Sequence, residues 1–522
     1  MVNTGPPPGG DGVRVGELLG VLSLAIDLGS GQPQGHGLRT CVLAVGLARE
    51  LGLDDSVVAE VNRVALLRFL GCTSDGAEVG RLGGGNDVAF RGAMATGVMG
   101  EPRAMLTNIV RMGGSDARRL GSVRRVASVL RDPKSRTRAM AGHCEVGAIL
   151  AAGLGMSEGV RTSLAHAFER WDGKGVPAGL AGEEVPWPVR IAVVARDVEL
   201  FHRLAPEELE EVLRARRGRA YDPSVVDAFG SCGAELLAEL DATDAWQGAL
   251  SADPESTFTM TGESLDRALM AIGQFVDLKS PWTSGHSARV AELASSAADL
   301  LGEDPAGVIA LRRAGLVHDL GQVGVPYGIW ARPDGLGPAD WELVRCHAMW
   351  GERALTAAPP LRGLASLVGA HHERLDGSGY HRQTDDARLS RAARVLAAAD
   401  VYAALCSLRP HRPALDPSTA TGVLRDEASA GRLDRQAVDA VLAAAGQRTP
   451  RLRSNWPAGL SDREVDVLRL IARGRTNREA AAELHVSTKT VGRHVENLYA
   501  KIGVSSRAAA AVFAMQEHLL DL

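Results

Sequence analysis

The chain has 522 residues, too many for one hydrophobic core, and the usual domain size of about 150 residues predicts three or four domains. Its 58 basic and 63 acidic residues give a net charge of -5, so nucleic-acid binding would have to depend on a local surface. The six cysteines form no CxxC pair, which argues against a zinc ribbon or a secreted disulfide framework. We therefore expect a cytoplasmic protein with reduced thiols, and the absence of a leader-like start or long apolar run predicts no membrane association.

The apolar residues recur with helical spacing, as in ALMAIGQFV and VAELASSAADLL, while aromatic residues make up only 4% of the chain. This pattern predicts an all-α protein. Composition shifts divide the chain into segments. We expect a disordered start at 1–12, a first domain at 13–240, a linker at 241–261, a second domain at 262–445, a linker at 446–457 and a third domain at 458–522.

The first two domains are predicted to be copies of one another. The stretch GHGLRTCVLAVGLARELGL from Gly35 parallels GHSARVAELASSAADLLG from Gly285, and ERWDGKGVP from Glu169 parallels ERLDGSGYH from Glu373. Two helical segments therefore keep a common register in both copies.

The register is then broken by an insertion. His36 precedes Arg68 by 32 residues, and His286 precedes His318 by the same interval. Beyond that point the first copy has about 46 extra residues, rich in glycine and arginine, between 72 and 140. This insertion could be a lid, a dimer contact or a disordered segment.

The second copy contains a candidate set of metal ligands. Adjacent His-Asp and His-His pairs cannot share one helix face, but at helix ends they can offer neighbouring donors to two bridged ions. The candidate ligands are His286, His318, Asp319, His347, His371, His372 and Asp400.

The motifs HDLGQVGVP, CHAMWGE, AHHERLDGSGY and AAADVYAAL closely resemble the HD-GYP family, the cyclic di-GMP phosphodiesterase branch of the HD phosphohydrolases. The resemblance covers about residues 262–445. It implies an all-helical domain that binds two or three divalent ions, iron or manganese, through those seven residues, with Asp319 as the bridging and catalytic carboxylate. Oxygen and imidazole donors without thiolate are consistent with such metals.

The second copy also departs from the family pattern. Gln322 stands where the family has a lysine that neutralises the scissile phosphate, and loss of such a group costs about 3 kcal/mol of transition-state binding. His381 replaces the proline of GYP, Ala403 replaces a common aspartate, and Trp282 stands where some members have a glutamate for a third ion. We therefore expect a pair of ions and weak or altered catalysis, in which Gln322 occupies a catalytic place.

The first copy has lost more of the candidate metal ligands. Arg68-Phe69 stands at the place of the His-Asp pair, and Ala167-Phe168 at the place of the His-His pair. Without the bridging carboxylate, two ions are not expected here, and the first copy is predicted to serve packing or dimerisation. The donors that remain are His36, His143, His166 and Asp197.

The third domain has the pattern of two helices about a tight turn. Ser461 and Glu464 form a capping box, and Ser487 caps a later helix after a turn at His485-Val486. In that later helix an apolar stripe formed by Val491, Val495 and Leu498 leaves a polar face exposed.

The block from LSDREVDVL to SSRAAAAVFA resembles the LuxR-type DNA-binding domain, a four-helix helix-turn-helix module of bacterial transcription regulators. Such domains usually read double-stranded DNA as dimers, so we expect a homodimer. Lys489 and Arg493 suit guanine edges and Glu496 a cytosine amine, whereas the short polar side chains and Lys501 suit phosphates. The predicted DNA-binding residues are Ser487, Thr488, Lys489, Thr490, Arg493, Glu496 and Lys501.

Two functions remain open on these grounds. In one, the protein is a transcription regulator whose metal-binding domain senses or slowly hydrolyses a phosphorylated ligand such as a cyclic dinucleotide. In the other, it is an active metal-dependent cyclic di-GMP phosphodiesterase, and the helix-turn-helix is its locator or regulator. The ligand set favours the enzyme, whereas Gln322, His381 and Ala403 disfavour it.

Overall fold

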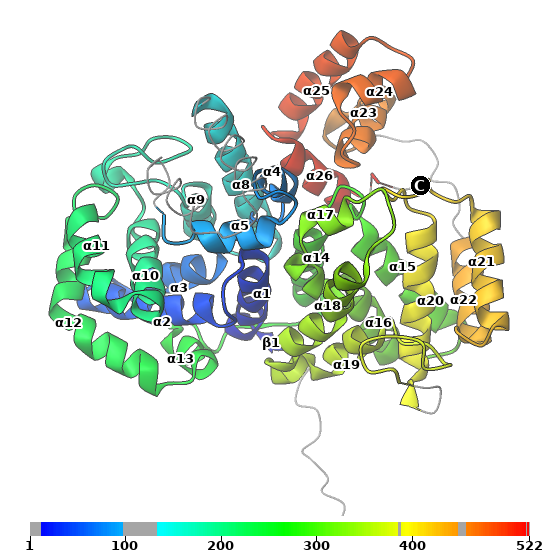
Figure 1. The fold of residues 1–522 in the computed structure, drawn as a ribbon, viewed down its shortest axis with the longest axis horizontal. Helices are drawn as coiled ribbons and strands as arrows, with labels where there is room; N and C mark the ends of the chain where they lie inside the picture. The colour runs from blue at the N-terminus through cyan, green and yellow to red at the C-terminus, as the bar shows by residue number, and fades with distance from the viewer. Residues whose placement is uncertain (1–11, 98–132, 385–387, 447–455, 518, 521–522) are drawn as a thin grey trace, which may run out of the picture.

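The computed structural model describes residues 12–97, 133–384, 388–446, 456–517 and 519–520. Within these residues the protein is mostly helical, as predicted. Two helical domains lie side by side, and a small third domain projects above their junction (Figure 1). No helix in the described residues is long and apolar enough to cross a bilayer.

The first domain holds one short strand and most of the N-terminal helices. Its main elements are β1 (Val13–Arg14), α1 (Val15–Ser30), α2 (His36–Glu50), α3 (Asp55–Leu67), α4 (Gly76–Leu82), α5 (Asp87–Met94), α8 (Pro133–Gly153), α9 (Glu158–Ala165), α10 (Trp187–Leu204), α11 (Leu209–Arg216), α12 (Pro223–Ala242) and α13 (Ala245–Ala252). Two 3₁₀ turns, Gly182–Glu184 and Pro206–Glu208, join them.

The second domain repeats this arrangement. Its elements are β2 (Thr259–Met260), α14 (Gly262–Asp277), α15 (His286–Leu300), α16 (Pro305–Val317), the 3₁₀ turn η3 (Leu320–Gly324), α17 (Tyr327–Trp330), α18 (Pro338–Thr356), the turn η4 (Pro359–Leu361), α19 (Arg362–Ala370), α20 (Arg391–Leu405), α21 (Pro417–Ser429) and α22 (Arg435–Gly446). Helices α2 and α15 both have 15 residues, and α3 and α16 both have 13, so the sequence repeat is also a structural one.

The two copies are packed tightly against each other. Strands β1 and β2 pair antiparallel, with Val13 opposite Met260, and one continuous hydrophobic core includes buried residues of both domains. Across the junction, Lys279 donates to Asp87 at 2.5 Å, and both side chains are buried. Tyr327 donates its backbone N–H to the other oxygen of Asp87 at 2.7 Å. The described part of the insertion, which includes α4 and α5, thus holds the first domain to the second.

The segment 241–261, expected to be a linker, contains α13 and β2. Asp244 caps α13 by accepting from the backbone of Gln247, and the Trp246 ring lies against Gly20 of α1. An eight-residue helix is too short for a clear periodic signal, so its tertiary contacts determine it. The expected disorder of residues 1–12 and the linker at 446–457 lie almost wholly outside the described residues.

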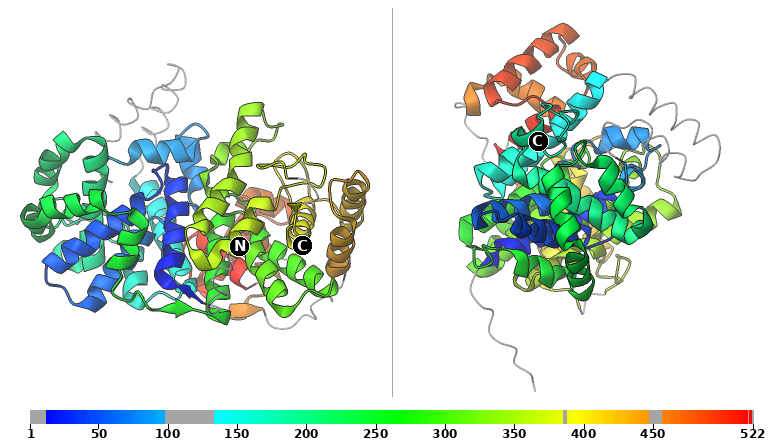
Figure 2. Two further views of the ribbon diagram at one scale, coloured as in Figure 1. Left: turned by 90° about the horizontal axis from the view of Figure 1, so that it is seen from below. Right: turned by 90° about the vertical axis from the view of Figure 1, so that its left-hand side faces the viewer.

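The third domain consists of a turn at Pro457–Gly459 followed by α23 (Asp462–Ala472), α24 (Asn477–Glu483), α25 (Thr488–Ile502) and α26 (Arg507–Gln516). Its last helix packs against two cores at once. Ala510, Ala511 and Ala514 belong to the core of the third domain. Ala509, Val512 and Met515 belong to the continuous core of the first two domains. The right-hand view of Figure 2 shows the third domain above α8 of the first domain, against which α26 packs.

Candidate metal centre and DNA-binding surface

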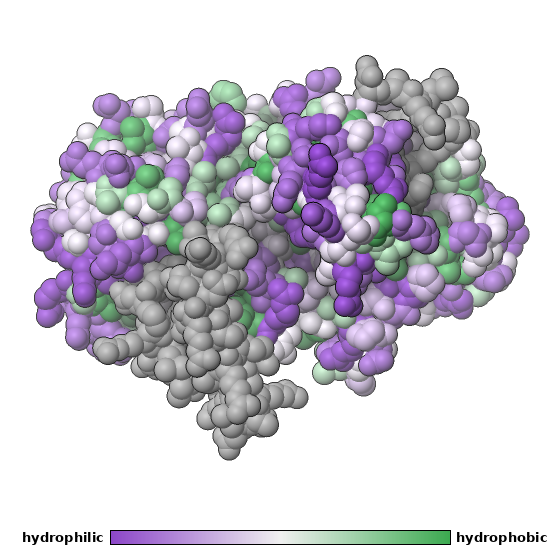
Figure 3. Space-filling view, turned by 90° about the horizontal axis from the view of Figure 1, so that it is seen from above, coloured by the Kyte–Doolittle hydropathy of each residue, from purple (hydrophilic) through white to green (hydrophobic). Residues whose placement is uncertain are grey.

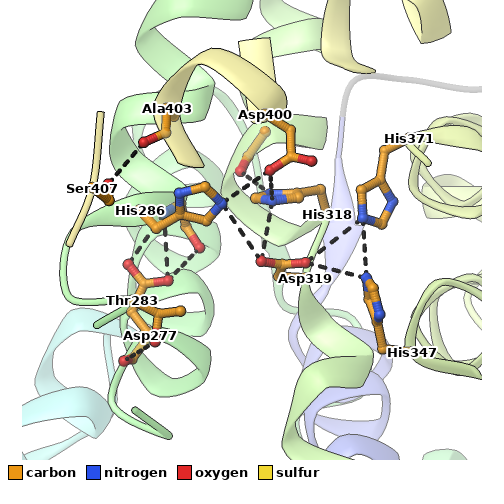
Figure 4. Close-up of polar contacts among 12 residues, drawn as sticks. Asp277, Thr283, His286, His318, Asp319, His347, His371, Asp400, Ala403 and Ser407 are labelled. Atoms are coloured by element: carbon orange, nitrogen blue, oxygen red, sulfur yellow. Dashed lines mark hydrogen bonds and ion pairs between the residues drawn. The ribbon is translucent and has the colours of Figure 1, made fainter. Parts of the chain in front are cut away.

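All seven predicted ligands of the second domain lie together. His286 begins α15, the His318-Asp319 pair ends α16, and the His371-His372 pair ends α19. His347 comes from the middle of α18 and Asp400 from α20. Six of the seven are labelled in the close-up of Figure 4, where their polar atoms point toward one another.

Asp319 lies between two groups of imidazoles. Its Oδ2 lies 3.2 Å from His318 Nε2 and 3.7 Å from His286 Nε2 (Figure 4). Its Oδ1 lies 3.4 Å from His347 Nε2 and 3.6 Å from His371 Nε2. Donor atoms that share one ion at about 2.1 Å are separated by on the order of 3 Å, so each oxygen of Asp319 faces a set of suitable spacing. This is the geometry of a bridging carboxylate.

Asp400 completes the arrangement from the opposite side. Its Oδ1 lies 3.1 Å from His286 Nε2, and its Oδ2 lies 3.6 Å from His372 Nδ1. Within the described residues, two clusters could therefore hold metal ions, one formed by His286, His318 and Asp319, the other by Asp319, His347, His371 and His372.

Backbone contacts orient three of the imidazoles. The Nδ1 atoms of His318, His347 and His371 lie 2.9, 2.5 and 2.5 Å from the carbonyl oxygens of the residue three places earlier. A ring that donates from Nδ1 presents an unprotonated Nε2 to the site, as ligating histidines do. His318 Nε2 and Asp319 Oδ1 are buried and have no hydrogen-bond partner. Such orphaned acceptors fit bound cations.

The electrostatics of the centre also fit cations. Burial raises the pKa of Asp319, but the neighbouring His318 and further imidazoles outweigh burial and hold that pKa well below its usual range. Burial lowers the pKa values of His286, His371 and His372, which keeps these rings neutral. Although burial lowers it, the Asp319 carboxylate raises the pKa of His318 to about 9, so this ring becomes a ligand only when an ion displaces its Nε2 proton. The carboxylates are thus ionised and most of the rings are available as ligands.

Sequence reasoning missed the residues that support the centre. Asp277 at the end of α14 accepts from Ser287 through Oγ at 2.7 Å and so fixes the start of the helix that carries His286. Asp27 plays the same part in the first copy, where it accepts from the backbone of Gly35 at 2.9 Å. Asp27 and Asp277 each stand nine residues before the histidine that begins the next helix. That shared spacing was the sequence signal from which the two supporting carboxylates could have been predicted.

The residues that depart from the family pattern lie around the centre. Gln322 is half-buried in η3, three residues after Asp319. Trp282 stacks on Tyr327 with ring centroids 6.2 Å apart. His381 Nε2 lies 3.5 Å from Glu352, outside the two clusters. Arg409, which sequence analysis did not select, is close enough for Asp319 and Asp400 to raise its pKa, although burial leaves that pKa below its usual value.

In the first copy, the remaining candidate metal donors contact other side chains. His36 contacts Glu199, and Asp197 accepts from Arg196 at 2.6 Å and from Arg216 at 2.6 Å. Arg68, at the place of His318, lies over the rings of Phe69 and Phe168, 5.9 and 5.6 Å from their centroids. That two ions do not bind here stays a prediction, and this pairing is consistent with it.

The third domain has the predicted helix-turn-helix. Ser461 and Glu464 form the capping box of α23, with the Ser461 N–H 2.8 Å from the Glu464 carboxylate. Ser487 caps α25 by accepting from Thr490 N–H at 3.1 Å. In α25, Val491 and Leu498 are fully buried, as expected. Helices α24 and α25 therefore enclose the tight turn predicted between them.

The polar face of α25 is open to solvent. Ser487, Thr488, Lys489, Arg493 and Glu496 are exposed, and Thr490 is half-buried. Lys501 is also exposed, but it donates to Gly459 O at 3.0 Å and to Glu464 at 2.7 Å, so it also ties α25 to the start of the domain. Seen from the side on which this domain projects, hydrophilic side chains gather over it (Figure 3).

Fold and site define a protein in which an HD domain is joined to a LuxR-type helix-turn-helix. Residues 271–437 match the HD domain family, and residues 458–514 match the bacterial regulatory proteins of the luxR family. The chain is 31% identical over 417 residues to the 3'3'-cGAMP-specific phosphodiesterase 3 of Vibrio cholerae, an alignment that spans 78% of this chain and 90% of the relative. The chain therefore belongs to the HD-domain family of that phosphodiesterase.

Two further comparisons are consistent with this family assignment. The crystal structure of a cyclic GMP-AMP specific phosphodiesterase of Vibrio cholerae superimposes with a TM-score of 0.58 at 28% identity, covering 84% of this chain and 99% of that one. A cyclic di-GMP phosphodiesterase of Thermotoga maritima is 30% identical over 160 residues, which is 30% of this chain and 44% of the relative. The likeness to the Vibrio cholerae proteins extends over both helical copies, beyond the single metal-binding domain.

Proposed function

We propose that the protein is a DNA-binding transcription regulator whose second HD domain binds two divalent ions and senses, or slowly hydrolyses, a cyclic dinucleotide. The observation that carries the proposal is the position of the metal centre relative to the DNA-binding domain. His286 lines a cleft of about 1020 Å³ between the second domain and the third. A ligand in this cleft would reach the metal centre at His286 and would contact α23 and α26 of the third domain.

The walls of this cleft suit an anionic ligand. The lining has five arginines, Arg289, Arg312, Arg469, Arg473 and Arg475, and two glutamates, Glu292 and Glu483. Arg475 forms an ion pair with Glu483 at 2.8 Å, and the arginines outnumber the carboxylates. Trp282 and Trp456 supply aromatic surface on which a base can stack. The names of the relatives support cyclic GMP-AMP and cyclic di-GMP as ligands to test.

The same cleft supplies the coupling. Ser284, two residues before His286, donates through Oγ to Ala472 O at 2.9 Å, and Gly474 lies against Pro281. A ligand can shift the third domain only if it binds two arrangements with different affinity. A ligand that contacts both walls of the cleft meets that condition.

The centre can also support hydrolysis, which is the alternative function. Two divalent ions bound to these ligands would neutralise phosphoryl charge and lower the pKa of water. Asp319 would be among the residues that hold the ions, and Asp277 and the backbone carbonyls would hold the imidazoles in place. Gln322 supplies no positive charge to the phosphate, which favours sensing or slow turnover.

The test is metal content and hydrolysis of 3'3'-cGAMP and cyclic di-GMP, measured on the anaerobically purified chain. The variants are His318→Ala and Gln322→Lys, with His202→Ala in the first domain as the control. We expect close to two ions per chain, little turnover, and faster turnover in Gln322→Lys. Rapid hydrolysis that His318→Ala abolishes would instead establish the enzyme. Wild-type protein that binds no metal would contradict both functions.

A further inference from the structure

The first copy contains a cavity of about 230 Å³ at the place where the second copy has its metal centre. The cavity is lined by Arg68, Arg91, Arg196 and His143 on its polar side. Phe69, Phe90, Met94 and Phe168 form apolar walls. It is smaller than the roughly 300 Å³ of the smallest drug-sized pockets, so its occupant would be a small molecule.

Arg68 is the unusual group in this cavity. Its side chain is 8% exposed, and its Nε and Nη1 atoms have no hydrogen-bond partner. Within the described residues no carboxylate forms an ion pair with it. Burial lowers the pKa of Arg68 to about 10, which still leaves it charged at neutral pH. A buried charge without a counter-charge is strongly unfavourable, so the site is electrostatically incomplete.

The carboxylates near Arg68 are already neutralised by other cations. Asp197 accepts from Arg196, Arg216 and the hydroxyl of Tyr221. Asp75 contacts Arg91, and His143 Nδ1 lies 3.4 Å from its other oxygen. Glu169, the third carboxylate of the lining, accepts from the backbone N–H groups of Ala178 and Gly179. Within the described residues, Arg68 thus forms an ion pair with none of the three.

A second polar group in the cavity also lacks a partner. His143 is 2% exposed, and its Nε2 is buried without a partner. The ring is held by Asp75 on one side and lies edge-on to Phe168, with centroids 5.0 Å apart. Arg68 and His143 thus offer unsatisfied polar atoms beside aromatic walls.

We propose that this cavity binds a small organic anion, with a carboxylate or phosphate-ester head on Arg68 and an apolar or aromatic body against the apolar walls. The first copy would then be a ligand-binding module built on the site that lost its metal ligands. A guanidinium forms paired hydrogen bonds with either head group, and burial strengthens them. The site uses none of the residues of the metal centre and is independent of what that centre does.

Calorimetric titration of the full chain with phenyl phosphate, benzoate and inorganic phosphate tests the proposal. We expect one saturable site per chain for phenyl phosphate or benzoate, at least tenfold tighter than for inorganic phosphate. The better of the two organic probes identifies the head group. Absence of saturable binding by both, or equal binding of inorganic phosphate, would overturn the proposal.

Three variants locate the site. Arg68→Met should lose at least tenfold in affinity, whereas the exposed Arg214→Met and the metal-centre variant Asp319→Asn should bind as the wild type does. Binding that survives in Arg68→Met, or that is lost in Asp319→Asn, would contradict the assignment. Hydrogen exchange of the wild-type protein locates the site without relying on the folding of a variant. Probe binding should protect α3 and α10, and protection confined to the second domain would also contradict it.

Discussion

At the scale of single residues, the exposed face of α25 carries the DNA-binding proposal. Lys489 and Arg493 are exposed and are free of ion pairs within the described residues, so their charges are available to DNA. A side chain that reads a guanine edge contributes about 1–3 kcal/mol of discrimination. Lys489→Ala and Arg493→Ala should each weaken binding to a selected duplex about tenfold or more, measured by fluorescence anisotropy.

The control for this prediction is Arg425→Ala, which removes an exposed charge from α21 of the second domain. It should bind the duplex as the wild type does. Equal loss in all three variants would mean that binding depends on overall charge and not on the α25 face.

Glu464 gives a prediction on pH dependence. Although burial raises its pKa, the contacts with Lys501 and Ser461 lower that pKa to about 2. Because this lies below the unfolded value of about 4.3, the contribution to stability is complete above that pH and is lost as the pH falls toward 2. Glu464→Gln should therefore cost on the order of 1 kcal/mol at pH 7 and progressively less below pH 4.

Urea unfolding of the third domain, which has its own hydrophobic core, measures this difference. The exposed Glu496→Gln serves as the matched control and should leave the pH dependence unchanged. A constant difference between Glu464→Gln and the wild type from pH 3 to 7 would contradict the role of the carboxylate.

Much of the site was predictable from single residues, but the contacts that depend on packing between distant segments were not. Residue type and spacing within the motifs selected seven candidate ligands, which the fold brings together: six lie in the two clusters that could hold metal ions, and Asp400 contacts His286. The partnership of His36 with Glu199 spans 163 positions and depends on how α2 packs on α10. The unpaired state of Arg68 also depends on packing, since the sequence does not show that Asp197 is taken by Arg196 and Arg216.

At the scale of elements, the buried pair between Lys279 and Asp87 fixes α5 of the first domain to the end of α14. Asp87→Ala would leave the Lys279 ammonium buried without a partner, because that side chain is only 3% exposed. Breaking a buried pair in this way costs about 3–5 kcal/mol. We expect a lower midpoint of thermal unfolding and a second transition as the domains separate, measured by calorimetry.

Two further variants separate the loss of the Asp87 charge from the loss of its hydrogen bonds. Asp87→Asn can still accept from the Tyr327 N–H and removes only the charge, so it should be destabilised less than Asp87→Ala. The pair Asp87→Leu with Lys279→Met removes both charges and should recover part of the loss. An unchanged midpoint in Asp87→Ala would show that the junction does not depend on this pair.

The helices that repeat between the copies were predictable, whereas the elements that join the copies were not. The common motifs place α2 with α15 and α3 with α16, since periodic apolar stripes and identical spacing fix them. By contrast, α4, α5 and α13 are seven or eight residues long, and their position depends on contacts with distant segments. The central part of the insertion, 98–132, lies outside the described residues.

At the scale of the whole molecule, α26 connects the helix-turn-helix domain to the two helical copies. One face of this helix belongs to the core of the third domain and the other to the core of the first two. Ser505, just before α26, also donates to Glu145 of α8 at 2.7 Å. A shift of the third domain would therefore change contacts with both copies, so the arrangement can respond to a ligand in either one.

The most direct test of this coupling is the affinity of the metal-loaded full chain for a duplex selected by the protein itself. It is measured with and without hydrolysis-resistant phosphorothioate analogues of 3'3'-cGAMP and cyclic di-GMP, in the wild type and in Asp319→Asn. We expect a saturating analogue to change the Kd of wild-type protein for DNA by about 5- to 150-fold, the usual range of allosteric coupling, and to leave Asp319→Asn unchanged. An unchanged Kd in wild-type protein that calorimetry shows to be saturated with analogue would contradict the account.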